Sequence, residues 1–239
     1  MQALDLNFRK QSLKNMILIS GTPRSGTHYT AALLQDLGLK VHHEKLDADG
    51  TVSWKHIRSG TFAVPERKRS SEIFDPGFTT VIHQVRHPLK SISSMYTLRY
   101  CSWEFMARHV EIDLAAPLPV RAMQAWLGWN QIIGERAEWR FQIEELPEVF
   151  DQLLTRLKRP QVALPQLSHQ SRESRTSRYT LLTWGNLLHA DAALAEKVAG
   201  LAREYGYQVG DLAELEPVAA VTPKIPSKLR RLVQKLFKN

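Results

Sequence analysis

The chain has 239 residues, of which 43% are hydrophobic and 23% charged, and its formal net charge is +8. This length suits one sizeable core with a short appended segment, and the composition is that of a globular protein. Because Cys101 is the only cysteine, an intrachain disulfide and a cysteine metal site are excluded.

The sequence favours a cytoplasmic protein with an anionic ligand. Residues 1–14 are polar and mixed in charge, unlike a signal peptide, and no apolar run approaches the roughly 20 residues that span a bilayer. The positive charge is compatible with nucleic acid, an acidic glycan, a membrane surface or a phosphorylated cofactor. Because no helix-turn-helix, zinc or RNA-binding motif is seen, we expect no nucleic-acid partner.

The first predicted unit is a strand, a glycine loop and a helix. Residues 16–19 form an apolar, partly β-branched run that predicts a buried strand, and residues 20–26 form a turn of small residues. Residues 27–38 predict a helix, with Gly38 as its end. Such a unit directs backbone N–H groups and a helix dipole at one point, which favours an anion there.

The loop sequence GTPRSGTH (residues 21–28) is close to a Walker A motif but differs from it in one decisive residue. Walker A has a lysine after its second glycine, whereas this chain has Thr27 there and places its cation inside the loop, as Arg24. The strand 79–85 ends in Arg86 rather than in an acidic Mg²⁺ ligand. These differences disfavour a Mg²⁺-dependent NTPase. The alternative is an ordinary strand-to-helix turn.

The remaining elements alternate between strand and helix. We predict short extended pieces at 40–42 and 51–54, a polar, basic surface loop over 58–76, and strands over 79–85 and 139–143. We predict helices from Pro88, over 102–136 with a break at Pro117 and Pro119, from Leu146, and from a cap at Asp191 to a stop at Gly206. Residues 159–178 are expected to be irregular.

This alternation predicts a three-layer α/β fold, with a mostly parallel central sheet and helices on both faces. We place a single domain over residues 1–210 and a basic extension over 211–239. In that extension, residues 227–239 predict a basic amphipathic helix. It fits peripheral contact with an anionic membrane, or docking on its own core or on a subunit of an oligomer.

Arg86 is the second candidate anion ligand. It follows the strand 79–85, at the sheet edge where open α/β folds bind ligands, and Ser94 lies eight residues further on. An arginine fork and a serine hydroxyl suit one phosphate group. The alternative is a strand-end arginine in an ordinary salt bridge.

Two motifs together resemble the sulfotransferase superfamily, and the chain is closest in character to its bacterial members. PRSGT (residues 23–27) resembles the family's 5′-phosphosulfate loop, and VRHPLKSISS (residues 85–94) resembles its 3′-phosphate motif. The match covers residues 16–100 well. Weaker similarity lies in FQIEEL (residues 141–146) and in LTWGNL (residues 182–187).

The resemblance implies a P-loop-like fold and a sulfotransferase that uses 3′-phosphoadenosine-5′-phosphosulfate (PAPS), releases adenosine 3′,5′-bisphosphate and needs no metal. Arg24 would bind the transferring sulfuryl group. The 5′-phosphate would be bound by Ser25, Gly26, Thr27 and His28, and the 3′-phosphate by Arg86 and Ser94. Tyr29 would stack on adenine or lie in the core.

The resemblance leaves open what closes over the cofactor. The family's glycine-rich lysine segment is not found in this sequence. Arg172, Arg175 and Arg178 are candidates to replace it, and the alternative is an exposed arginine loop.

The catalytic base is expected at Glu44, which is favoured over His43; both lie just beyond a predicted strand, in the region where many family members carry a Glu or a His. One of the pair would be the base and the other its orienting partner. The alternative is a structural pair bonded to nearby loop backbone. His56 and His83 are lesser candidates.

The predicted reaction is sulfuryl transfer to a hydroxyl of a glycan, lipid or small-molecule acceptor, and the basic surface points to an acidic acceptor. Two alternatives remain from other classes: a P-loop kinase-like phosphotransferase, and a non-catalytic nucleotide-binding relative. The missing Walker lysine disfavours the kinase, whereas the presence of both motifs and a candidate base disfavours the non-catalytic protein.

Overall fold

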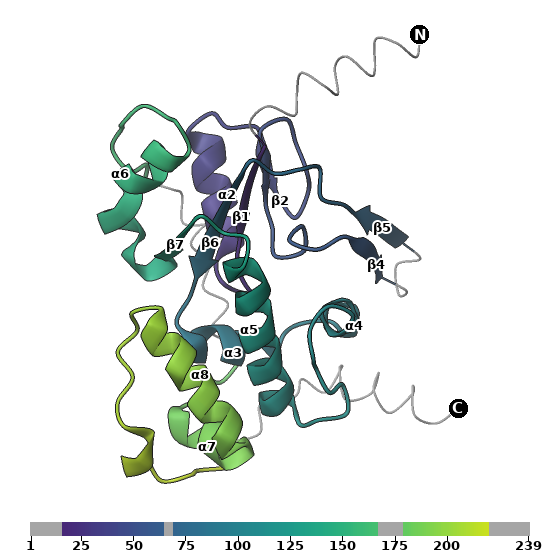
Figure 1. Cartoon of the computed structure of the whole chain (residues 1–239), viewed down its shortest axis with the longest axis vertical. Coiled ribbons are helices and arrows are strands. Elements are labelled where there is room, and N and C mark those ends of the chain that lie inside the picture. Colours follow the sequence, from purple (N-terminus) through teal and green to yellow (C-terminus); the bar gives the residue numbers. More distant parts are fainter. Residues whose placement is uncertain (1–15, 65–68, 167–178, 220–239) are drawn as a thin grey trace.

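The computed structural model describes residues 16–64, 69–166 and 179–219, which form an α/β fold around a parallel sheet (Figure 1). The five strands of this sheet lie in the order β2-β3-β1-β6-β7, and every neighbouring pair is parallel. Their bounds are Ile17–Ser20 for β1, Val41–His43 for β2, Gly50–Val52 for β3, Thr80–Val85 for β6 and Trp139–Gln142 for β7. The predicted α/β class with a parallel sheet is therefore confirmed.

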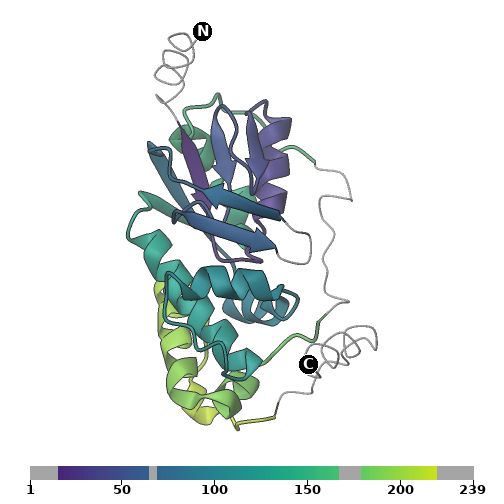
Figure 2. The ribbon, with the colours of Figure 1, turned by 90° about the vertical axis from the view of Figure 1, so that its right-hand side faces the viewer.

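Helices cover both faces of the sheet. Their bounds are Thr27–Asp36 for α2, Pro88–Met95 for α3, Tyr100–Ala107 for α4, Leu118–Gly134 for α5, Leu146–Arg156 for α6, Trp184–Ala190 for α7 and Ala192–Glu204 for α8. One core joins the sheet to residues of α2 and α6, and the other joins it to residues of α3, α4, α5, α7 and α8. Figure 2 shows the sheet in the upper half of the molecule and most of the second helix group below it.

The first apolar run of the sequence forms β1, and both faces of this strand are buried. Leu18 belongs to one core, whereas Ile17 and Ile19 belong to the other. A central strand of a parallel sheet is covered on both faces, so apolar side chains predominate on both of its faces. The next strands are β2 and β3 on one side of β1, and the chain then crosses to β6 on the other side. Ligands bind at such a switch point in open α/β folds, at the carboxyl ends of the strands.

The prediction of a surface loop over 58–76 is wrong. The segment contains an antiparallel hairpin, with β4 at Gly60–Val64 and β5 at Arg69–Ile73. In β4, Phe62 and Val64 are half-buried and alternate with exposed Thr61 and Ala63. This alternation is a strand signal, and the basic and Pro/Gly residues around it concealed it.

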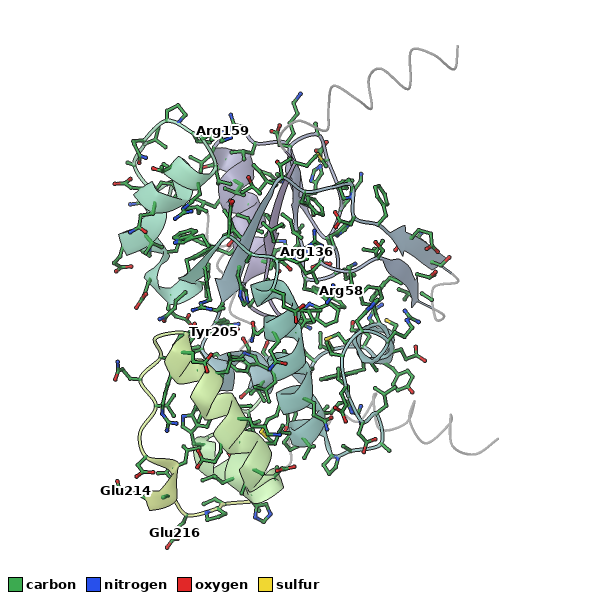
Figure 3. The ribbon with its side chains drawn as sticks, in the orientation of Figure 1. Arg58, Arg136, Arg159, Tyr205, Glu214 and Glu216 are labelled. Atoms are coloured by element: carbon green, nitrogen blue, oxygen red, sulfur yellow. The ribbon has the colours of Figure 1, made fainter. Side chains whose placement is uncertain are left out.

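The hairpin is held to the end of α5 by two arginines (Figure 3). Arg136 lies 2.7 Å from the Asp75 carboxylate and donates a hydrogen bond to the Ile57 carbonyl at 3.2 Å. Arg58 lies 3.6 Å from the Glu135 carboxylate. The segment between β3 and β6 is thus fastened at its base, and β4 packs on α4.

The helical region predicted over 102–136 is interrupted more widely than expected. α4 ends at Ala107 and α5 begins at Leu118, so residues 108–117 are not helical. Pro119 does not break the helix, because it lies in the first turn of α5, where its missing N–H costs no hydrogen bond. The other predicted helix signals are confirmed: the Asp191 carboxylate caps α8 by accepting from the Leu194 N–H at 2.9 Å, and Gly206 follows with φ of 86°.

Two predicted features lie outside the described residues: the amphipathic segment 227–239, and the arginines Arg172, Arg175 and Arg178. Within the described part of the chain, none of the helices combines the length and the apolar character needed to cross a membrane. Leu212, in the region assigned to the extension, is buried in the same core as α5 and α8.

Candidate functional site

The loop over residues 21–27, here called the anion loop, begins where β1 ends and leads into α2. Its first residue is packed against β6. A Cβ atom on Gly21 would lie 2.2 Å from the Gln84 carbonyl oxygen and 2.4 Å from the Ser25 hydroxyl. Such distances are far inside van der Waals contact, so only glycine fits where the loop leaves the sheet.

Two residues give the anion loop a concave backbone. Arg24 has φ of 75° and Gly26 has φ of 95°, both in the left-handed region. Gly26 is followed by the helical residue Thr27, and this left-handed to right-handed sequence turns successive N–H groups toward one point. A left-handed arginine is uncommon, and the strained backbone at Arg24 is typical of functional loops.

The anion loop has backbone N–H groups that the first turn of α2 does not use. Among the described residues, the N–H groups of Gly26, Thr27 and His28 have no hydrogen-bond partner, and the first helical bond is from the Tyr29 N–H to the Gly26 carbonyl at 2.9 Å. The Ser25 hydroxyl is buried and has no partner among the described residues either. Unsatisfied donors at a helix N-terminus fit the oxygens of a phosphate or sulfate group.

Two side chains, one in β6 and one directly after it, hold the anion loop. The Gln84 side-chain amide donates from Nε2 to the Ser25 carbonyl at 2.7 Å, and its Oε1 accepts from the Thr30 hydroxyl at 2.6 Å. Two residues on, Arg86 donates from Nη1 to the Arg24 carbonyl at 2.8 Å. The two predicted motifs therefore meet at the carboxyl edge of the sheet. Gln84 was not predicted, although an amide inside an apolar strand is a visible signal.

The Arg24 side chain links the anion loop to α3. Its Nη2 donates to the Thr97 carbonyl at 3.2 Å, just beyond the end of α3. Ser94 is only 4% exposed, and its carbonyl accepts from the Thr97 N–H at 3.1 Å and from the Thr97 hydroxyl at 2.8 Å. Arg24, Arg86 and the final turn of α3 thus form one connected group.

His43 lies at the carboxyl end of β2 and reaches the anion loop. Its Nε2 is 3.1 Å from the Thr27 hydroxyl, and its ring packs edge-on to the exposed His28 ring at a centroid distance of 5.2 Å. The same Nε2 is 3.5 Å from Glu44 Oε1. The predicted base region is therefore in direct contact with the predicted anion site.

Glu44 is held by a set of donors from the segment after β3. Its Oε2 accepts from the Ser53 hydroxyl at 3.1 Å and lies 3.2 Å from Lys55 Nζ, and its Oε1 accepts from the Trp54 N–H at 3.3 Å. Burial raises the pKa of Glu44, and the Lys55 charge and these hydrogen bonds oppose the rise. A carboxylate fixed in this way suits an orienting or proton-accepting group.

Lys55 is itself mostly buried and is positioned by aromatic rings. Its side chain is 13% exposed, and Nζ lies 4.4 Å from the centroid of the Phe62 ring. His56 joins the same network, because its Nδ1 is 2.8 Å from the Ser53 hydroxyl, and burial lowers its pKa. Ser53 and Lys55 were not predicted as site residues; the pairing of β2 with β3 brings them to Glu44.

Two other predicted residues lie away from this group. His83 is fully buried on the α5 face of the sheet, where its Nε2 is 3.0 Å from Asn130 Oδ1. Burial lowers the pKa of His83 to about 4, so it is neutral near pH 7 and suits a structural role. Tyr29 is half-buried and packs against the core between α2 and α6.

The acidic segment after β7 contacts the second motif. Glu144 accepts from the His87 N–H at 3.2 Å, lies 3.4 Å from Lys90 Nζ, and accepts from the Tyr207 hydroxyl at 3.1 Å. Burial lowers the pKa of His87 and raises that of Tyr207. The turn after α8, where Figure 3 labels Tyr205, is fastened here as well, because Gln142 Nε2 donates to the Tyr205 carbonyl at 3.0 Å.

The described residues contain no group of three or more His, Cys, Asp or Glu side chains that could hold a metal ion. The donors gathered at the carboxyl edge are instead N–H groups, guanidinium groups and hydroxyls. Comparison with known proteins adds no assignment, since no family model, curated protein or solved structure matches the chain.

The close contact at Gly21 yields the first prediction. Gly21→Ala should destabilise the protein by about 2–3 kcal/mol, because the added methyl group forces the loop and β6 apart. Gly200→Ala is the matched control, since that α8 glycine has nothing within 4 Å of its Cβ position and alanine is the better helix former. Urea unfolding measures both variants. Equal stabilities of the two variants would contradict the packing argument.

The buried Glu44–Lys55 pair yields the second prediction. Lys55→Met should destabilise the protein by about 3 kcal/mol at pH 8, because it leaves a buried carboxylate without its cation. Losing Lys55 raises the folded-state pKa of Glu44 further above its ordinary 4.5, so stability falls as the pH rises above that value. The deficit relative to the native protein should therefore shrink toward pH 5.

The double variant Glu44→Gln/Lys55→Met is the control for this pair, because it removes both charges and should recover most of the stability at pH 8. Urea unfolding at pH 5 and pH 8 measures all three proteins. A Lys55→Met deficit that does not change with pH would show that the pair makes no ionic contribution.

Proposed function

We propose that this protein is a sulfotransferase that moves a sulfuryl group from PAPS to a hydroxyl acceptor. The observation that carries the proposal is the contact between the two anion-binding motifs, in which Arg86 donates to the Arg24 carbonyl at 2.8 Å. A donor that carries phosphate groups at both its 3′ and 5′ positions needs two such sites side by side. The resemblance of both motifs to the sulfotransferase superfamily supports the same assignment.

In this proposal the anion loop binds the 5′-phosphosulfate. The N–H groups of residues 26–28 and the hydroxyl of Ser25 face oxygens that carry negative charge. Arg24 stabilises the charge that develops on the bridging oxygen as the sulfuryl group leaves. Arg86 and Ser94 bind the 3′-phosphate, for which a guanidinium fork is well suited.

His43 and Glu44 form the proton-accepting pair. As the acceptor oxygen bonds to sulfur, its proton passes to this pair, and adenosine 3′,5′-bisphosphate is the other product. The carboxylate of Glu44 already receives hydrogen bonds from Ser53 and the Trp54 backbone and an ionic contact from Lys55. We therefore assign the proton to His43, whose imidazolium form the Glu44 carboxylate stabilises at 3.5 Å.

In this proposal the acceptor carries negative charge. The net charge of +8 favours an acidic glycan, lipid or small molecule over a neutral one. Lys55 lies beside the Glu44 carboxylate, and Phe62 of the hairpin packs on Lys55, so these two residues are the nearest to the proton-accepting pair from the segment between β3 and β6.

Ligand binding tests the proposal without knowledge of the acceptor. Adenosine 3′,5′-bisphosphate at about 100 times its Kd should stabilise the protein by about 2.7 kcal/mol. For a chain of this size that is a rise in Tm of about 5–10 °C. ATP with Mg²⁺ should give a much smaller rise, because the loop has no Walker lysine.

Arg86→Ala should abolish most of this rise, whereas Arg99→Ala should retain it, since Arg99 is exposed and precedes α4. Thermal unfolding with each nucleotide measures all three proteins. A larger shift with ATP and Mg²⁺ than with the bisphosphate would replace the proposal by the phosphotransferase alternative.

The assignment of the base gives a further prediction. In a screen of hydroxyl acceptors with radiolabelled PAPS, His43→Ala should lower turnover by about 10²–10⁴-fold, the usual contribution of a general base. Glu44→Gln should lose less. His42→Ala should keep full turnover, because this neighbouring histidine is exposed and pairs with Asp47. A Glu44→Gln loss greater than that of His43→Ala would reverse the assignment.

A further inference from the structure

Gln84 is a buried side chain that the proposed mechanism does not use. It lies in β6, between His83 and Val85 in the sequence, and has no exposed surface. Both ends of its amide are engaged: Nε2 donates to the Ser25 carbonyl at 2.7 Å, and Oε1 accepts from the Thr30 hydroxyl at 2.6 Å. A buried amide costs stability unless it is fully bonded, so this side chain has one fixed orientation.

Peptide geometry passes this orientation on to the anion loop. The carbonyl of Ser25 and the N–H of Gly26 belong to the same planar trans peptide unit, in which the two groups point in opposite directions. Because Gln84 draws the Ser25 carbonyl toward β6, the Gly26 N–H is directed away from β6. That N–H has no hydrogen-bond partner among the described residues, and it is one of the donors available to an anion.

The hydrogen bond between Gln84 and Thr30 also fixes the direction of the Gln84 amide. Thr30 lies in α2, one turn after the helix begins, and its hydroxyl fixes the amide so that Nε2 faces the loop. Gln84 thereby joins β6, the loop and α2 in one chain of hydrogen bonds. Both polar atoms of its amide are used in these two bonds, so Gln84 acts on the anion loop and is not assigned as a ligand of the nucleotide.

We propose that Gln84 is a positioning residue, which sets the Gly26 N–H toward the 5′-phosphate of the donor nucleotide. The inference rests on the proposed function and adds a residue that the two sequence motifs do not assign. It predicts that Gln84 contributes to the affinity for the 5′-phosphate and not to the affinity for the 3′-phosphate.

Two nucleotides separate these contributions. Isothermal titration calorimetry gives the Kd of adenosine 3′,5′-bisphosphate and of adenosine 3′-monophosphate, which lacks the 5′-phosphate. For Gln84→Met, which keeps the length of the side chain without its amide, the bisphosphate should bind about tenfold more weakly than to the native protein, the loss expected for one hydrogen bond to a charged group. The Kd of the monophosphate should change by less than about twofold.

Asn130→Leu is the matched control, because it removes a buried polar pair with His83 on the opposite face of the same strand. It should lower stability as Gln84→Met does and leave the ratio of the two Kd values unchanged. If Gln84→Met leaves the ratio of the two Kd values unchanged, the inference is overturned while the proposed function stands. Failure of the native protein to bind the bisphosphate more tightly than the monophosphate would overturn the proposed function and the inference together.

A measurement on the native protein covers the case in which Gln84→Met does not fold. In ¹H–¹⁵N NMR spectra, the Gly26 amide proton should shift downfield with adenosine 3′,5′-bisphosphate and much less with adenosine 3′-monophosphate, because hydrogen bonding to a phosphate deshields it. An unmoved Gly26 resonance in a complex with the bisphosphate would overturn the inference.

Discussion

The close approach of β6 to the loop after β1 is the constraint on which the rest of the site depends. Gly21 permits it, since any larger residue would overlap the Gln84 backbone. Gln84 and Arg86 then hold the carbonyls of Ser25 and Arg24. With these acceptors drawn toward the sheet, the donors of the next residues are left for a ligand. The anion loop is therefore organised from the neighbouring strand as well as by its own glycines.

The second half of the site depends on a buried charge and its partner. Glu44 adopts φ of 62° and is surrounded by Ser53, the Trp54 N–H and Lys55. An unpaired carboxylate in this position would be strongly destabilising, so the segment after β3 is required to supply these donors. The Phe62 ring against Lys55 extends the dependence to the hairpin. Residues from the segment after β3 and from the hairpin thus hold one carboxylate beside His43.

Local signals in the sequence predicted most of the elements, and long-range contacts account for what was missed. The apolar strands, the proline at the start of α3 and the Asp191 cap depend on neighbours along the chain, so they could be read directly. The hairpin was not predicted because charged residues conceal its alternation of half-buried and exposed side chains. Gln84 and Lys55 were missed because their partners are distant in sequence: Gln84 lies 59 residues from Ser25, and Lys55 acts through a strand pairing.

Position 27 connects the two halves of the site. In a Walker A loop this position carries the lysine that reaches the outer phosphates of a nucleoside triphosphate. Here it carries Thr27, which is 4% exposed and whose hydroxyl is 3.1 Å from His43 Nε2. A lysine there would remove this contact and place a cation beside His43. If the proposed function is right, Thr27 connects the loop that binds the donor with His43, the group that receives the acceptor's proton. Arg24 then supplies the positive charge that a Walker lysine would carry.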